Sequence, residues 1–149
     1  MWLRSCGFDN GGAIPSRYTC DGENMSPSLT WGDVPVGARS LAIVLVDPDA
    51  PHGAFYHWAV YDIMATTSGL AEAASASASL AQGVNDFRKV GYGGPCPPHG
   101  DRPHHYRLRL LALSRDKLEL SPRPSCRMVE RTARGSLLEE ATVVGLYFR

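Results

Sequence analysis

The sequence contains no hydrophobic run long enough to cross a membrane. Its longest aliphatic run, Leu41–Val46, falls far short of the roughly 20 residues that a transmembrane helix needs. The first twelve residues also lack the apolar stretch of a signal peptide. These absences predict a cytoplasmic protein that keeps its thiols reduced and has no stable membrane insertion.

An excess of charge is also lacking, because 15 Lys and Arg residues balance 15 Asp and Glu residues. This balance argues against a dedicated nucleic-acid binder. The charges are unevenly distributed, however: acids outnumber bases in residues 1–101, and bases outnumber acids in residues 102–134. We interpret the basic stretch as a solvated face, and the alternative is a field that attracts anionic ligands or partners.

Cysteine is scarce and unpaired in the sequence. The four cysteines form no CxxC pair, which argues against a zinc site. Cys20 is interpreted as structural, and Cys96, between two prolines, as a small buried thiol rather than a nucleophile. The sequence leaves open whether any of the four form a disulfide, and it predicts no metal and no cofactor.

Helix signals are few, whereas 11 prolines and 15 glycines divide the chain into short segments. Apolar or alternating runs between these breakers predict strands at 40–46, 57–63, 106–113 and 143–148. The first of these is continuously aliphatic, as in a strand buried on both faces. One helix is expected at 126–134, with Ser125 as its N-cap and Gly135 near its end, or alternatively extending to Glu140. Residues 71–81 are expected to form a surface loop. A mainly β, mostly antiparallel single domain over residues 1–149 is therefore predicted.

Strand alternation assigns side chains to faces. In the second predicted strand, one face receives His57, Ala59, Tyr61 and Ile63, and the other receives Trp58, Val60 and Asp62. In the third strand, Tyr106, Leu108, Leu110 and Ala112 share a face, opposite Arg107 and Arg109.

All five histidines fall in two proline-rich segments, 47–58 and 94–106, each leading into a predicted strand. Prolines stiffen such loops and lower the entropic cost of holding polar groups in place. Asp47 could accept a hydrogen bond from one ring nitrogen of a nearby histidine, so that the opposite nitrogen donates to a ligand. Together with His57, His104 and the Tyr106 hydroxyl, this predicts a site for a phosphate or carboxylate group.

The motifs DPDAP followed by HW, and GPCPP followed by HHY, resemble the two signature regions of the phosphatidylethanolamine-binding protein family, in its prokaryotic Raf-kinase-inhibitor-like branch. Further matches extend along nearly the whole chain, among them TCDGEN at 19–24 and GLY at 145–147. The resemblance implies a sandwich of two antiparallel sheets with small peripheral helices, and a homodimer. It also implies an anion pocket for phospholipid headgroups or nucleotides, formed by Asp47, His57, Pro98, His104 and Tyr106, with Asp49 close by.

Two departures from the family pattern matter. His105 stands where relatives usually have arginine, and strand alternation is expected to turn it away from the pocket. Arg88 stands where many relatives have glycine, which alters a loop. His52 and His99 are expected to be solvated surface residues.

We therefore predict non-catalytic binding of a phosphate-bearing small molecule or headgroup. The resemblance adds a second expectation, that the protein regulates or inhibits a kinase or protease partner. The alternative is a hydrolase or phosphoesterase that uses Cys96 with His104, or the pair His57 and His104. No nucleophile elbow or P-loop motif is present to support it.

Overall fold

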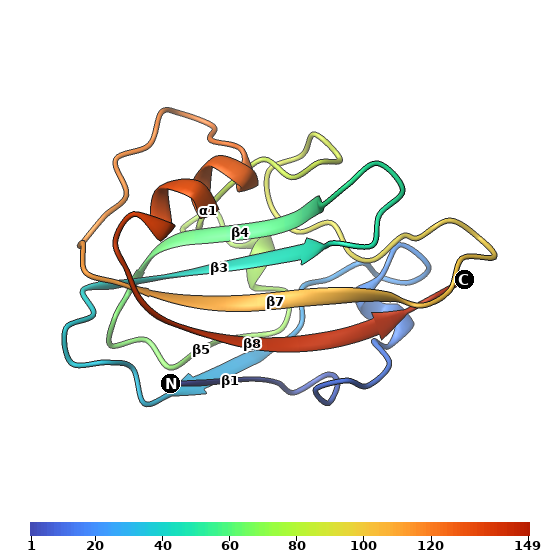
Figure 1. The fold of residues 1–149 in the computed structure, drawn as a ribbon, viewed down its shortest axis with the longest axis horizontal. Helices are drawn as coiled ribbons and strands as arrows, with labels where there is room; N and C mark the ends of the chain where they lie inside the picture. Colours follow the sequence, from blue (N-terminus) through green and yellow to red (C-terminus); the bar gives the residue numbers. More distant parts are fainter.

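Two antiparallel sheets form the framework of the protein in a computed structural model that describes residues 1–149 (Figure 1). The larger sheet has the order β6 (Ala81–Gln82), β4 (Phe55–Met64), β3 (Ser40–Asp47), β7 (His104–Leu113) and β8 (Leu137–Tyr147). The smaller sheet has the order β1 (Trp2–Ser5), β2 (Leu29–Gly32) and β5 (Gly69–Leu70). One helix, α1 (Cys126–Arg134), and two single-turn 3-10 helices, Ser16–Tyr18 and Ala74–Ala76, complete the fold. The predicted mainly β architecture of two antiparallel sheets is confirmed.

The larger sheet is covered on both faces. One face packs against the smaller sheet around Trp31, Trp58 and Tyr106, and the other packs under α1 around Val129 and Ala133. Figure 1 shows α1 lying over β4 and β3. Every residue of β3 is buried, which explains why its sequence is continuously aliphatic rather than alternating. No helix has the length and apolarity needed to cross a bilayer.

The central strands and the helix lie where the sequence predicted them. The helix spans Cys126–Arg134, with the Ser125 hydroxyl oxygen accepting a hydrogen bond from the amide of Met128 at 3.0 Å. Its alternative extension to Glu140 is wrong, because the chain turns at Gly135 and enters β8 at Leu137. β8 therefore begins six residues before the predicted start at Val143. Residues 71–81 form a loop, apart from the short turn at Ala74–Ala76 and the first residue of β6.

The predicted alternation fails in β4 because the strand contains a β-bulge. Leu41 pairs with Ile63, whereas Ile43 pairs with Val60, so β4 has one extra residue in this interval. Asp62 takes up the irregularity with a φ of 55°, and a bulge shifts the facing of everything beyond it. Ile63 consequently packs with Trp58 and Val60 in the core between the sheets, not with Ala59 as predicted.

Candidate functional site

A cavity of about 510 Å³ opens at one edge of the larger sheet. β3 ends at Asp47 where its antiparallel neighbours β4 and β7 begin, so His57 and His104 are brought to the same edge. The five residues from which the resemblance builds the anion pocket all border this cavity: Asp47, His57, Pro98, His104 and Tyr106. Its volume lies within the range of small-molecule sites.

Asp49 does not border the cavity, in contrast to its place in the predicted set. The amide of Asp49 donates to Asp47 Oδ1 at 2.8 Å, which closes a tight turn after β3. Asp49 Oδ2 instead accepts hydrogen bonds from the amide and the ring Nδ1 of His105, both at 2.8 Å. These bonds outweigh the effect of burial and lower the pKa of Asp49. His105 is exposed and turned away from the cavity, as alternation predicted.

Asp47 and Asp101 hold the ring of His104 from both sides. Nδ1 of His104 lies 2.7 Å from Asp47 Oδ2, and Nε2 lies 3.0 Å from Asp101 Oδ2. Burial opposes the charged ring, but the hydrogen bonds to the two carboxylates outweigh it and raise the pKa of His104. The carboxylate-oriented imidazole expected from the sequence is thus His104. The expectation that its opposite nitrogen donates to a ligand is wrong, since that nitrogen already faces Asp101.

His57 is the second imidazole of the cavity, and it is 3% exposed. Its Nδ1 lies 2.7 Å from the carbonyl oxygen of Gly93, and its ring contacts the rings of Phe55 and Phe87 edge-on or tilted. Burial lowers the pKa of His57, although Asp47 and Asp86 attract a proton to it. Burial thus favours the neutral form of the ring.

Tyr106 contributes a buried hydroxyl that has no hydrogen-bond partner. The residue is 1% exposed, and its ring packs edge-on against His57 and parallel to His104. Burial raises the pKa of Tyr106 well above its usual value, and the nearby Asp47 carboxylate raises it further. A buried unpaired hydroxyl costs about 1–3 kcal/mol, so this group is suited to a ligand oxygen.

The mouth of the cavity contains residues that the sequence did not indicate. Arg127, from the first turn of α1, stacks on the ring of Tyr56 with 4.4 Å to the ring centroid. Its guanidinium donates to the carbonyl oxygen of Ala54 at 3.0 Å and lies 3.9 Å from Asp86. Phe87 is 40% exposed beside it. No local pattern could reveal this group, because α1 reaches the mouth only through its packing on the larger sheet.

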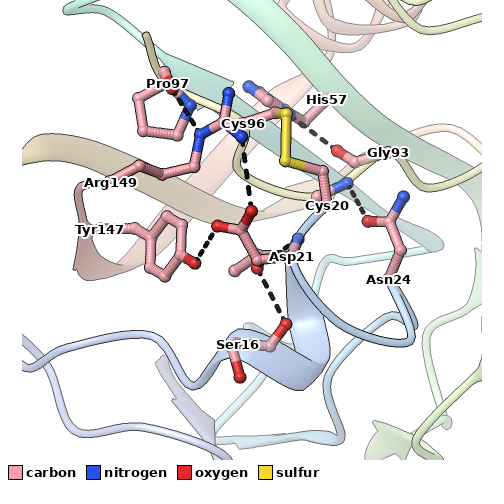
Figure 2. Close-up of a disulfide and its surroundings, with 12 residues drawn as sticks. Ser16, Cys20, Asp21, Asn24, His57, Gly93, Cys96, Pro97, Tyr147 and Arg149 are labelled. Atoms are coloured by element: carbon pink, nitrogen blue, oxygen red, sulfur yellow. Dashed lines mark hydrogen bonds and ion pairs between the residues drawn. A yellow bond between two sulfur atoms is a disulfide. The ribbon is translucent and has the colours of Figure 1, made fainter. Parts of the chain in front are cut away.

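A disulfide joins the cavity wall to the N-terminal part of the chain (Figure 2). Cys96, which borders the cavity, is bonded to Cys20 across 76 residues of sequence, with 5.4 Å between their Cα atoms. The expectation of reduced thiols is wrong for this pair, and Cys96 is not a buried thiol. The pairing was not visible in the sequence, because the two cysteines approach each other only in the folded chain.

Hydrogen bonds reinforce the disulfide on the same loop. The amide of Gly94 donates to Asn24 Oδ1 at 2.8 Å, and a Cβ at position 94 would lie 2.2 Å from the carbonyl oxygen of Tyr18, so only glycine permits this approach. From the C-terminus, Arg149 Nε donates to the carbonyl oxygen of Pro97 at 2.8 Å. Figure 2 shows Arg149 and Tyr147 both directed at Asp21, next to Cys20. The Gly93–Pro98 wall is therefore fixed at several points.

The arrangement leaves no free cysteine in the cavity to act as the nucleophile of the Cys96 form of the hydrolase alternative. Cys96 has no free thiol while it is bonded to Cys20. Of the two free cysteines, Cys6 is exposed and lies outside the cavity, and Cys126 is buried, with burial raising its pKa to about 12. No group of three or more His, Cys, Asp or Glu side chains is placed to hold a metal ion.

Comparisons with known proteins agree with this architecture. The family model described as phosphatidylethanolamine-binding protein matches residues 4–148. A UPF0098 protein of Aquifex aeolicus is 46% identical over 152 residues, covering all of this chain and 89% of the relative. The crystal structure of Escherichia coli YbcL, described as a member of the mammalian PEBP family, superposes with a TM-score of 0.94 at 33% identity, over 99% of this chain and 98% of YbcL. A Chlamydia trachomatis homologue superposes with a TM-score of 0.88 at 33% identity, over 99% and 97% of the two chains.

Proposed function

Because this chain belongs to the phosphatidylethanolamine-binding protein family, we propose that its cavity binds a phosphate-bearing small molecule or headgroup without chemically changing it. The observation that carries the proposal is the buried Tyr106 hydroxyl, which has no partner and stands between two imidazoles at the cavity wall. A ligand oxygen that accepts a hydrogen bond from it would remove the cost of leaving that group unpaired.

The mouth of the cavity supports a ligand with an organic portion beside its phosphate. Phe55 and Phe87 present ring edges there, at a centroid distance of 4.8 Å from each other, and Pro51 and Ala54 border the same opening. Arg127 adds a guanidinium that three neighbouring groups hold in place. Apolar lining with a few fixed polar groups is the usual composition of a small-molecule site.

The proposal is tested by titrating the protein with inorganic phosphate and with phosphoethanolamine, and by measuring binding with NMR and calorimetry. Tyr106→Phe is expected to weaken binding by roughly tenfold, the equivalent of about 1.4 kcal/mol for one lost hydrogen bond. His57→Ala is expected to weaken binding further. His105→Ala is the matched control, because it removes an exposed histidine outside the cavity and should leave affinity unchanged. Equal affinity in Tyr106→Phe, His57→Ala and the unmodified protein would remove the proposed site.

A further inference from the structure

Three arginines of the basic stretch at residues 102–134 line a groove that is separate from the anion cavity. The groove has a volume of about 420 Å³ and shares no lining residue with the cavity. Figure 1 shows α1 over β4 and β3, and the groove lies where β7, β8 and the last residue of α1 meet. Its only apolar side chain is Val144, and its polar side chains are His105, Arg107, Arg109, Arg134, Glu140 and Thr142.

Two of the three arginines are alternate residues of a regular strand. Arg107 pairs with Val144 of β8 and Arg109 pairs with Thr142, and the register between β7 and β8 is unbroken here. Alternate side chains leave a strand on the same face, about 7 Å apart. The groove therefore presents two guanidiniums in a row, at the spacing of alternate residues in any other extended chain.

A buried carboxylate holds part of this row in place. Glu130 of α1 is 5% exposed, and its Oε1 accepts hydrogen bonds from Arg109 Nη1 at 2.5 Å and from Arg134 Nε at 3.0 Å. The other oxygen of Glu130 is buried without a partner. Arg134 also donates to Glu140 Oε2 at 3.2 Å. Because Arg109 is ordered before any ligand arrives, binding to it costs less side-chain entropy.

The hydrogen-bonding groups that remain free in the groove are mostly donors. Arg107 has no partner in the protein, and Arg109 donates only through Nη1, so its Nε and Nη2 remain available. The hydroxyl of Thr142, opposite Arg109, has no partner either. His105 and Arg134 are already held by carboxylates. Of the three arginines only Arg107 has no carboxylate partner, so the groove keeps a positive charge.

Guanidiniums match carboxylates, which they bind through two parallel N–H···O bonds. We propose that this groove binds an extended acidic segment of another protein, which places two carboxylates at alternate positions on Arg107 and Arg109. The first carboxylate meets the unpartnered guanidinium of Arg107. The second accepts hydrogen bonds from the free side of Arg109 and from the hydroxyl of Thr142. This site is independent of the phosphate cavity and of the function proposed for it.

Other anionic macromolecules fit the groove less well. Proteins that bind single-stranded nucleic acid gain affinity from aromatic side chains on which the bases stack, and no aromatic side chain borders the groove. Proteins that bind a membrane surface insert apolar side chains into it, and here Val144 is the only apolar one. The groove is therefore better suited to an acidic peptide.

A second copy of this chain does not supply the segment. Its acids stand at alternate positions only at Asp21 and Glu23 and at Asp47 and Asp49. Asp21 and Asp47 are each hydrogen-bonded within the chain, so neither pair is free to enter the groove of another molecule. Two such grooves facing each other across a two-fold axis would also repel each other, because both are positively charged.

The test uses the complete protein and two synthetic peptides with blocked ends. The glutamates alternate in the peptide STETETS, whereas in STEETTS, which has the same composition, they are adjacent and point to opposite sides of an extended chain. In low-salt buffer at pH 7, calorimetry should show about tenfold tighter binding of the alternating peptide, because one charge-assisted contact is lost with the other. In NMR spectra the amides of Arg107, Arg109 and Thr142 should shift, and that of Gly93 at the cavity should not.

Variants of the groove assign the binding to particular side chains. Arg107→Gln should weaken binding of the alternating peptide about tenfold and remove its advantage over the adjacent one. Because Arg107 is exposed and has no partner, this change leaves the fold intact, whereas a change at Arg109 would remove a partner of the buried Glu130. Thr142→Val should weaken binding by a smaller factor. Arg123→Gln, at an exposed arginine of the same basic stretch outside the groove, is the matched control.

Several results would overturn the inference. These are equal affinities of the two peptides, or equal affinities of Arg107→Gln and Arg123→Gln for the alternating peptide. Tighter binding of a thymidine hexanucleotide than of the alternating peptide would assign the groove to nucleic acid instead. Binding to phosphatidylglycerol vesicles that Arg107→Gln abolishes, without binding of either peptide, would assign it to a membrane surface. None of these results bears on phosphate binding in the cavity, which shares no side chain with the groove.

Discussion

Nδ1 of His104 lies 2.7 Å from Oδ2 of Asp47, although 57 residues separate them in the sequence. Both side chains are about 95% buried, and the contact joins the end of β3 to the start of β7. A buried charged pair of this kind is strongly coupled, because neither partner can turn to water when the other is removed.

Replacing Asp47 with asparagine should change the protonation of His104. The change removes the charge of one of the two carboxylates that raise the pKa of His104. We therefore expect the pKa of His104 to fall, which an NMR titration of the ring would measure. Loss of a charge-assisted hydrogen bond should also lower the free energy of unfolding by about 2 kcal/mol at pH 6. Asp49→Asn, which alters a carboxylate outside the cavity, is the control. An unchanged His104 titration would contradict the assigned pairing.

The stability contributed by His104 should depend on pH in a defined direction. Its pKa in the folded protein is raised above the value of about 6.5 for an unfolded chain. The contribution is therefore fully present below pH 6.5 and is lost as the pH rises through the folded pKa. Urea unfolding of the unmodified protein and of His104→Gln, measured from pH 5 to 9, should give a difference that shrinks with rising pH. His57 is present in both proteins, so its own titration cancels in the difference between their free energies of unfolding. A difference that does not change with pH would count against the ion pair.

Opening the disulfide should destabilise the protein and loosen the cavity wall. Chain-entropy arguments assign about 4 kcal/mol to a cross-link that closes a loop of this length. The double change Cys20→Ser with Cys96→Ser should therefore lower the melting temperature and speed amide hydrogen exchange at Gly94. Cys6→Ser, at an exposed free cysteine, serves as the control and should alter neither. Unchanged exchange at Gly94 would show that its hydrogen bond to Asn24 holds the loop without the covalent link.

Replacing Arg88 with glycine should stabilise the protein. Arg88 has a φ of 66°, a conformation that costs a side-chain-bearing residue about 1–2 kcal/mol, and part of this is offset by the greater chain entropy of glycine. We expect a gain of about 0.5–1 kcal/mol in thermal or urea unfolding. Arg88→Ala removes the same charge but keeps the unfavourable φ, so it should give no gain. Equal gains from both variants would assign the effect to charge instead.

The sequence predicted the inner end of the cavity well because its residues sit at strand ends in recognisable motifs. Asp47, His57, His104 and Tyr106 lie on strands whose apolar runs were readable, and antiparallel pairing brought them together. The direction of each ring nitrogen was not predictable, since it depends on Gly93 and Asp101, whose placement follows from loop conformation.

Features built from long-range contacts escaped prediction for a common physical reason. The Cys20–Cys96 bond, the position of Arg127 at the cavity mouth and the bulge at Asp62 each depend on how separate elements meet. Short strands such as β1 and β5 carry too few residues to show a period. The homodimer, the kinase or protease partner and the cytoplasmic location remain predictions, because a single chain does not test them.

The cavity draws its walls from β3, β4, the Gly93–Pro98 loop, β7 and the first turn of α1, which together span the chain from Asp47 to Arg127. A growing polypeptide therefore cannot assemble the complete pocket until α1 has left the ribosome. Retention of a phosphate ligand would consequently report completed folding, and partly synthesised or truncated chains that end before α1 should lack it even where their central strands are already paired.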